Sequence, residues 1–154
     1  MTSQVLQQIH FSMLLPYSVA GMGEPWIEKM AATHADLRRN GIGAILTLTE
    51  DNLYGQHHIE AGFLLHHEPM DDGEAPAIVA LERSMEFIDS AQCSGHGVAV
   101  HCLEGRGRTG AVLACWLARK ENLRAESAIK RLRYLRPYTA LSASQKKFLL
   151  DYLD

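Results

Sequence analysis

Short apolar runs and longer amphipathic stretches alternate along most of the chain. Apolar residues at helical spacing, such as Ile78, Leu81, Met85 and Ile88, indicate a helix that covers a core with one face. Short runs such as 98–100 are typical of buried strands. The pattern predicts a strand pair around 10–20, a helix over 25–39, strands over 43–49 and 62–67, a helix over 77–92, a strand over 98–102, and helices near 109–121, 124–136 and 142–153.

Strands that alternate with helices indicate an α/β fold with a central, largely parallel sheet flanked by helices. The chain has 154 residues, the length of one domain, so we expect residues 1–154 to form a single domain. Ligands of such sheets bind at the carboxyl ends of the strands. The end of the strand predicted over 98–102 is therefore the first candidate for a functional site.

The segment 101–110, which reads HCLEGRGRTG, follows that strand and precedes an unbroken apolar run over 111–118. The loop thus lies at the N-terminus of a buried helix. Backbone N–H groups have no intrahelical partner there, and the helix dipole favours an anion. Gly105, Gly107 and Gly110 let the backbone curl closely around that anion. The segment therefore predicts a phosphate-binding loop between a strand and a helix.

Cys102 and Arg108 stand six positions apart in this loop. A helix N-terminus and a guanidinium both favour the thiolate form of a cysteine, so Cys102 is the predicted nucleophile. The planar fork of Arg108 can hold two phosphate oxygens. Thr109 would stabilise the sulfur as a leaving group, and His101 is interpreted as an orienting hydrogen-bond partner. A glycine-rich turn around a buried cysteine is the alternative, but it requires none of these side chains.

A departing alkoxide or phenoxide needs a proton, so an acid is expected on a nearby loop. The segment 69–76, PMDDGEAP, lies between a predicted strand and a predicted helix, and its Pro and Gly residues mark a loop. Asp71 and Asp72 are its candidate acids. Two solvated turn aspartates without a catalytic role are the alternative interpretation.

These residues resemble the HCxxGxxR(S/T) signature of the cysteine-dependent protein tyrosine phosphatases. Within that superfamily the chain is most similar to the small atypical dual-specificity phosphatases, notably over 46–50, 97–102 and 131–137, and the resemblance spans nearly the whole chain. It implies that 1–154 is one dual-specificity phosphatase-like catalytic domain. Alignment of Pro69 and Pro76 with the acid loop of the family makes Asp72 the general acid, with Asp71 as the alternative. The implied phosphoryl-binding segment consists of Leu103, Glu104, Gly105, Arg106, Gly107 and Arg108.

The resemblance implies a phosphomonoester phosphatase that forms a cysteinyl-phosphate intermediate. Its expected substrates are phosphotyrosine and also phosphoserine or phosphothreonine of proteins, because the chain lacks a Trp-Pro-Asp loop and the N-terminal region that deepens the pocket of tyrosine-specific relatives. The alternative is the same chemistry on a phosphoinositide, another phospholipid or a small molecule, since Arg106 occupies a position where lipid-acting members carry a basic residue. An inactive phosphate-binding module is a third possibility. Gln145 is a candidate for positioning the hydrolytic water, or else an exposed helix residue.

Composition and charge indicate the setting of the site. The chain has a formal net charge of −3, no apolar stretch of membrane-spanning length, no signal-peptide pattern and no C-terminal cysteine for lipidation. Three cysteines without metal-ligand spacing are typical of a reducing compartment. We therefore expect a cytoplasmic protein. Together with the resemblance, this leads us to expect a monomer with a phosphorylated substrate, no nucleic-acid partner and no cofactor. The pairs His57-His58 and His66-His67 lack a supporting ligand pattern, so no metal is expected.

Two further features have competing interpretations. Cys93 could form a disulfide with an oxidised Cys102, although an inert free thiol is the interpretation that we favour, and Cys115 is predicted to lie in the core. The segment 119–136 carries a local excess of positive charge that could attract phosphorylated partners, but a solvated helix face is the default interpretation. Its basic residues are Arg119, Lys120, Arg124, Lys130, Arg131, Arg133 and Arg136.

Overall fold

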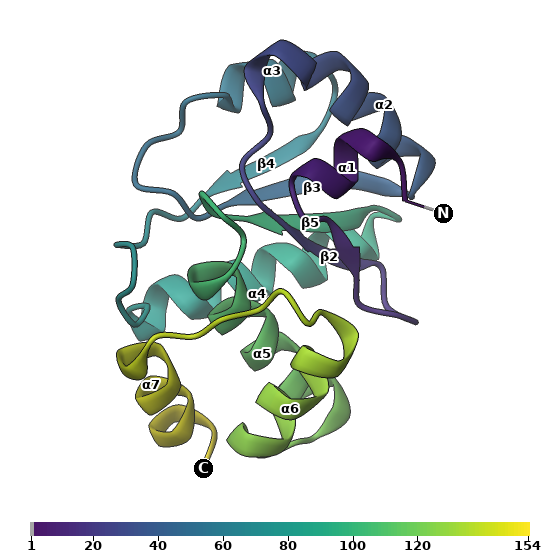
Figure 1. Ribbon diagram of the computed structural model, residues 1–154. Helices are drawn as coiled ribbons and strands as arrows, with labels where there is room; N and C mark the ends of the chain where they lie inside the picture. Colours follow the sequence, from purple (N-terminus) through teal and green to yellow (C-terminus); the bar gives the residue numbers. More distant parts are fainter. Residues whose placement is uncertain (1) are drawn as a thin grey trace.

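A five-stranded sheet separates two layers of helices in the computed structural model, which describes residues 2–154 (Figure 1). The strands lie in the order β1-β2-β5-β3-β4; β1 and β2 are antiparallel, and the other neighbours are parallel. The predicted α/β fold with a largely parallel central sheet is confirmed. The strands are β1 (Ser12–Met13), β2 (Val19–Met22), β3 (Ile42–Thr47), β4 (Leu64–His67) and β5 (Gly97–His101).

The helices divide into an N-terminal and a C-terminal layer. Figure 1 shows α1 to α3 above the sheet and α4 to α7 below it. The upper layer contains α1 (Gln4–Gln8), the 3-10 turn η1 (Ile27–Lys29), α2 (Met30–Arg39) and α3 (Gly55–Glu60). The lower layer contains α4 (Ile78–Cys93), α5 (Gly107–Glu121), α6 (Ala125–Leu135) and α7 (Ala143–Leu153).

Both faces of the central strands are covered, and this explains their continuous apolar sequences. Every residue of β3 and β5 is buried. Leu46 and Val100 belong to the core between the sheet and α4 to α7, whereas Ile45 and Ala99 belong to the core on the side of α1 and α2. Parallel strands that are buried on both faces read as apolar runs rather than as alternating patterns.

The register of the sheet brings four loops to one edge. His101 at the end of β5 lies opposite Met22 of β2 and Thr47 of β3, and Thr47 lies opposite His67 of β4. The segments that follow these strands therefore start side by side. They contain Glu24, Glu50, Asp72 and Cys102, which are far apart in the sequence.

The predicted element boundaries differ from the structure at a few places. The helix expected over 25–39 is split into η1 and α2, and the short helices α1 and α3 were not predicted. Helices of five or six residues give too little periodicity to detect, and a cap such as the Ser3 hydroxyl, which accepts from the Leu6 N–H, stabilises α1 locally. Among the helices of residues 2–154, none is long and apolar enough to cross a membrane.

Candidate active site

The loop between β5 and α5 turns sharply at Gly105, whose φ is +78°. A Cβ at this position would also lie 2.5 Å from the carbonyl oxygen of Met22 on β2. Only glycine satisfies both constraints without strain. Gly107 begins α5, and a Cβ there would lie 2.8 Å from Oε1 of Gln145. The two glycines thus let the loop pack closely between β2 and α7.

The Cys102 sulfur is buried at the N-terminal end of α5 and accepts two hydrogen bonds. The Gly105 N–H donates to Sγ at 3.2 Å, and the Thr109 hydroxyl donates at 3.1 Å. These two donors, together with the positive end of the α5 dipole, would stabilise negative charge on the sulfur. The sulfur therefore has the surroundings of a nucleophile.

His101 does not contact the sulfur. Its Nε2 lies 2.8 Å from the Thr47 hydroxyl and its Nδ1 lies 3.2 Å from the Cys102 carbonyl oxygen. Burial lowers the pKa of His101 to about 4, and the positive charge of Arg108 adds to this effect. A neutral ring that donates from Nδ1 and accepts at Nε2 fits both contacts, so the side chain links β3 to the backbone of Cys102.

Arg108 is buried, with 2% of its side chain exposed, yet the protein does not satisfy all of its donors. Nη1 donates to the Met70 carbonyl at 3.0 Å and to Oε1 of Glu50 at 2.5 Å, and Nη2 lies 3.6 Å from Oδ1 of Asp72. Nε is buried without a hydrogen-bond partner among the described residues. A buried donor of this kind is expensive unless a ligand accepts from it, so this atom indicates an anion site.

Asp72 lies in the segment between β4 and α4 and faces the phosphate loop. Its side chain is 77% exposed, and it lines a hollow of about 160 Å³ together with the loop, whereas Asp71 does not. This hollow, called the phosphate-loop hollow below, is lined by Asp72, Cys102, Leu103, Glu104, Arg106, Gly107 and Arg108. The structure therefore brings together the predicted nucleophile, the predicted arginine and the preferred acid.

The first turn of α7 holds the loop that carries Asp72. The hydroxyls of Ser142 and Ser144 donate to the Gly73 carbonyl at 2.7 and 3.0 Å. Nε2 of Gln145 donates to the Glu74 carbonyl at 3.3 Å. Gln145 is buried against Gly107, so the alternative of an exposed helix residue is wrong.

Comparisons with known proteins identify the family of the chain. A family model described as "Polymorphic toxin system, DSP-PTPase phosphatase" (Tc-R-P) matches residues 20–122, which is more than half of the chain. The chain belongs to this family. The resemblance to small atypical dual-specificity phosphatases of the cysteine-dependent superfamily is thereby confirmed.

Individual relatives of this DSP-PTPase have different named activities. Phosphatidylglycerophosphate phosphatase PTPMT2 of Arabidopsis thaliana is 29% identical over 123 residues, covering 75% of this chain and 53% of the relative. Tyrosine-protein phosphatase cdc-14 of Caenorhabditis elegans is 31% identical over 108 residues, covering 70% of this chain and 15% of the relative. The chain thus spans about half or less of the length of these curated relatives.

Solved structures match nearly the whole chain. Tk-PTP in the active form is 22% identical with a TM-score of 0.81, and the match covers 94% of this chain and 95% of that one. PTPMT1 in complex with PI(5)P is 19% identical with a TM-score of 0.80, covering 93% of this chain and 94% of that one. These likenesses show that the DSP-PTPase shares its fold with both proteins.

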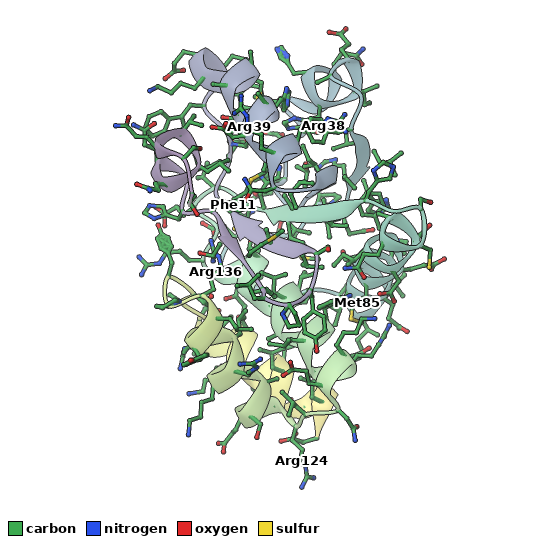
Figure 2. All side chains as sticks on the ribbon, turned by 90° about the vertical axis from the view of Figure 1, so that its right-hand side faces the viewer. Phe11, Arg38, Arg39, Met85, Arg124 and Arg136 are labelled. Carbon is green, nitrogen blue, oxygen red and sulfur yellow. The ribbon has the colours of Figure 1, made fainter. Side chains whose placement is uncertain are left out.

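Arg136 is a part of the site that the sequence did not reveal. The basic segment 119–136 predicts a solvated position for Arg136, but its side chain is fully buried, and burial lowers its pKa to about 10. It donates to the carbonyl oxygen of Gly105 in the phosphate loop and to that of His10 at 2.9 Å. Figure 2 shows the contrast with Arg124, which projects from the end of the helical layer. The available signal was its position after α6 and before Pro137, where the helical face ends.

Two glutamates near Arg108 were also missed. The pKa of Glu50 is lowered by a backbone hydrogen bond and by its hydrogen bond to Arg108, whereas partial burial raises the pKa of Glu24. Both line a second hollow of about 190 Å³, the middle hollow, with Thr49, Asp51, Leu53, Asp72, Leu103 and Arg108. The signal that could have identified Glu50 is its position directly after the strand predicted over 43–49. Glu24 stands four residues beyond the predicted strand pair, so its signal is weaker.

Arg106 lies at the rim of the phosphate-loop hollow. Its Nε donates to the Tyr138 carbonyl at 3.2 Å, and its guanidinium lies 4.5 Å from the centre of the Tyr138 ring. These contacts hold the arginine against the segment between α6 and α7. Glu104 is exposed at the same rim, so it contributes to the hollow from the solvent side.

The remaining cysteines lie away from the Cys102 sulfur. Cys93 ends α4 near the start of β5, whereas Cys102 follows the other end of that strand. Five strand residues span about 16 Å, and a disulfide requires Cα atoms within about 7 Å. A direct disulfide between Cys93 and Cys102 is therefore excluded by the fold. Burial raises the pKa of Cys115 to about 12, as fits the core thiol that was predicted.

The histidine pairs are engaged in separate contacts. His58 lies in α3, and its Nδ1 is 2.8 Å from Nε2 of His34, while His66 contacts Glu68 at 2.9 Å. His67 contacts the Thr49 carbonyl at 2.7 Å. Within residues 2–154, no three His, Cys, Asp or Glu side chains are grouped so that they could hold a metal ion.

Proposed function

We propose that this protein is a phosphomonoester phosphatase that acts through a cysteinyl-phosphate, on phosphotyrosine and also on phosphoserine and phosphothreonine of proteins. The observation that supports the proposal most strongly is the unpartnered Nε of buried Arg108, in a hollow that Cys102 and Asp72 also line. A phosphate oxygen would accept from this atom. The family supports the same chemistry.

In the first step the Cys102 sulfur attacks phosphorus, an S–P bond forms and the P–O bond to the leaving group breaks. Nε and Nη2 of Arg108 and the backbone amides from Leu103 to Arg108 would hold the other phosphate oxygens as the charge on them rises. Asp72 would donate its proton to the departing oxygen. The 77% exposure of Asp72 leaves room for a leaving group beside it.

In the second step water attacks phosphorus, and Asp72, now a carboxylate, takes a proton from that water. The S–P bond breaks and inorganic phosphate forms. The Thr109 hydroxyl and the Gly105 N–H, at 3.1 and 3.2 Å from Sγ, would stabilise the departing thiolate. Because both ends of the Gln145 amide already bond to Ser142 and Glu74, we assign Gln145 to holding the acid loop.

Turnover of an aryl phosphate in EDTA tests the proposal, because no step requires a metal. Cys102→Ser and Arg108→Lys should each lower kcat by ~10³-fold or more, as the loss of a nucleophile or an oxyanion donor does in other enzymes. Cys93→Ser, an exposed cysteine away from the site, is the matched control and should keep full activity. Metal-independent activity retained by pure Cys102→Ser protein would refute the mechanism. Anion binding without turnover in the unmodified protein would instead indicate an inactive phosphate-binding module.

A phospholipid or phosphoinositide substrate is the second candidate. The name of PTPMT2 and the PI(5)P complex of PTPMT1 support it, as does Arg106 at the rim of the hollow. If Arg106 binds a second anionic group, Arg106→Ala should lower kcat/KM on a phosphoinositide by ~10-fold or more and spare a small aryl phosphate. Equal losses on both substrates would make Arg106 a residue that shapes the loop. The acidic residues of the middle hollow favour protein substrates over polyanionic ones.

We further propose a cytoplasmic monomer that acts on phosphorylated proteins and has no nucleic-acid partner. Three free cysteines, including exposed Cys93 and the candidate nucleophile Cys102, suit a reducing compartment. Light scattering of the purified protein tests the monomeric state. Fractionation of cells that express it tests the location.

A further inference from the structure

The cleft continues past the middle hollow into a larger groove of about 430 Å³, which we call the aromatic groove. Glu24 and Leu103 line both the groove and the middle hollow. The middle hollow in turn shares Asp72, Leu103 and Arg108 with the phosphate-loop hollow. A substrate whose phosphate is bound at Arg108 can therefore extend continuously into the aromatic groove.

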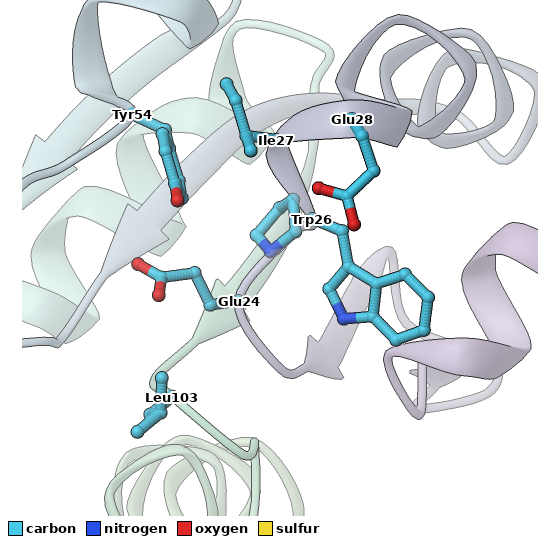
Figure 3. A pocket seen from close by; sticks show the side chains of 7 residues that line it. Glu24, Trp26, Ile27, Glu28, Tyr54 and Leu103 are labelled. Carbon is cyan, nitrogen blue, oxygen red and sulfur yellow. The ribbon is translucent and has the colours of Figure 1, made fainter.

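The aromatic groove combines apolar surfaces with two carboxylates. Figure 3 shows Glu24 beneath Tyr54, and Glu28 above the indole of Trp26. Trp26, Ile27 and Leu103 are 42%, 47% and 57% exposed, although large apolar side chains are usually covered. No lysine or arginine lines the groove. Lys29, which is not among the lining residues, places its Nζ 5.9 Å from the centre of the Trp26 ring.

Building on the proposed phosphatase activity, we propose that the aromatic groove binds a lysine or arginine side chain of the phosphorylated protein segment. Such a side chain has an apolar stem and a cationic end, so it can pack its stem on Trp26 and Tyr54 and pair its charge with Glu24 and Glu28. The groove thereby selects substrates with a basic residue close in sequence to the phosphorylated one.

The backbone holds the groove in place before a substrate binds. The Glu24 N–H donates to the Leu103 carbonyl at 2.9 Å, which ties the segment after β2 to the phosphate loop. Partial burial raises the pKa of Glu24, so a cation beside it would recover interactions that the carboxylate lost with water. A rigid, partly desolvated carboxylate binds a cation better than a mobile surface one.

Charge along the cleft favours the same class of ligand. Glu24, Glu50, Asp51 and Asp72 line the middle hollow, where Arg108 is the cation. One phosphate would be held by Arg108 and the loop amides, but a second anionic group would meet carboxylates. Electrostatic complementarity therefore favours a cation on the far side of the bound phosphate.

The test measures kcat/KM for phosphotyrosine peptides that differ at one flanking position. A single lysine is moved through the flanking positions, and each peptide is compared with its alanine and glutamate counterparts. At the position that reaches the groove, lysine should exceed alanine by up to about 5-fold, as expected for a partly exposed ion pair. Glu28→Lys should reverse the preference toward glutamate and leave turnover of a small aryl phosphate unchanged, because Glu28 lies outside the other two hollows.

Glu82→Gln, an exposed glutamate on α4, is the matched control and should keep the lysine preference. A wild-type protein without preference at any position, or Glu28→Lys protein that keeps it, would overturn the inference. Peptide binding to Cys102→Ser protein separates this inference from the proposed activity. A lysine preference in binding without turnover by the wild type would refute the phosphatase proposal alone, whereas turnover without the preference would refute the groove alone.

Discussion

The buried guanidinium of Arg108 has more hydrogen-bond donors than the surrounding protein has acceptors for them. Glu50 and Met70 occupy Nη1, while Nε has no partner among the described residues. An oxyanion bound by the folded protein alone raises the free energy of unfolding by about 2.7 kcal/mol at a concentration of 100 times its Kd. Inorganic phosphate should therefore raise the Tm of the wild type and have much less effect on Arg108→Lys. Arg119→Lys, at an exposed position on the same helix, is the control for the loss of a guanidinium. If phosphate raises the Tm of Arg108→Lys as much as that of the wild type, the assignment of Arg108 to anion binding is contradicted.

Asp72 and Asp71 are distinguished by the leaving group. With an alkyl phosphate, whose leaving group is poor, Asp72→Asn should lower kcat by ~10²–10⁴-fold, and with a good aryl leaving group the loss should be smaller because less proton donation is needed. Asp71→Asn should change much less, since Asp71 does not line the phosphate-loop hollow.

The comparison of the two variants on the alkyl phosphate decides the assignment. A loss of kcat that is larger in Asp71→Asn than in Asp72→Asn would exchange the roles of the two neighbours.

On the scale of whole elements, the acid loop depends on α7. Ser142 and Ser144 both donate to the Gly73 carbonyl, one residue after Asp72. Replacing both serines by alanine should lower kcat by ~10-fold with an alkyl phosphate, equivalent to one lost hydrogen bond, and less with an aryl phosphate. Loss of the Ser142 cap should also destabilise the protein by about 1 kcal/mol. Ser127→Ala, exposed on α6, should change neither quantity, and equal rate losses on both substrates would argue against a role in placing the acid.

The sequence predicts the long elements and the phosphate loop because their signals are local. The apolar run over 111–118 lies in α5, and HCLEGRGRTG lies at its N-terminal end. Arg136 and Glu50 could not be assigned in the same way, since their importance comes from contacts with Gly105 and Arg108, which are distant in sequence. Charge patterning predicts that an arginine after a basic helix is solvated. Only the docking of the segment after α6 against β2 and the phosphate loop buries Arg136.

Across the whole molecule, buried histidines make stability depend on pH. Burial lowers the pKa of His58 to about 3 and that of His101 to about 4, against about 6.5 for an unperturbed histidine. Below about pH 6.5 the unfolded chain takes up protons that the folded protein does not, so the free energy of unfolding falls as the pH falls toward 4. Each histidine contributes at most about 1.4 kcal/mol per pH unit. Urea unfolding between pH 7 and 5 should show this dependence of the free energy of unfolding on pH. His58→Gln should reduce the slope, whereas exposed His57→Gln, the control, should leave it unchanged. An unchanged slope in His58→Gln would contradict the explanation.

The central claim is that Cys102 carries the phosphoryl group during turnover. Asp72→Asn should slow the second step, so with an aryl phosphate that has a good leaving group the intermediate should accumulate. The measurement is rapid quenching of this variant during turnover, followed by peptide mass spectrometry. The account predicts one phosphoryl group on the peptide that contains Cys102, and none when Cys102→Ser is added. A phosphoryl group on another residue during turnover would contradict the account. A burst of aryl alcohol without any phosphorylated protein would contradict it as well.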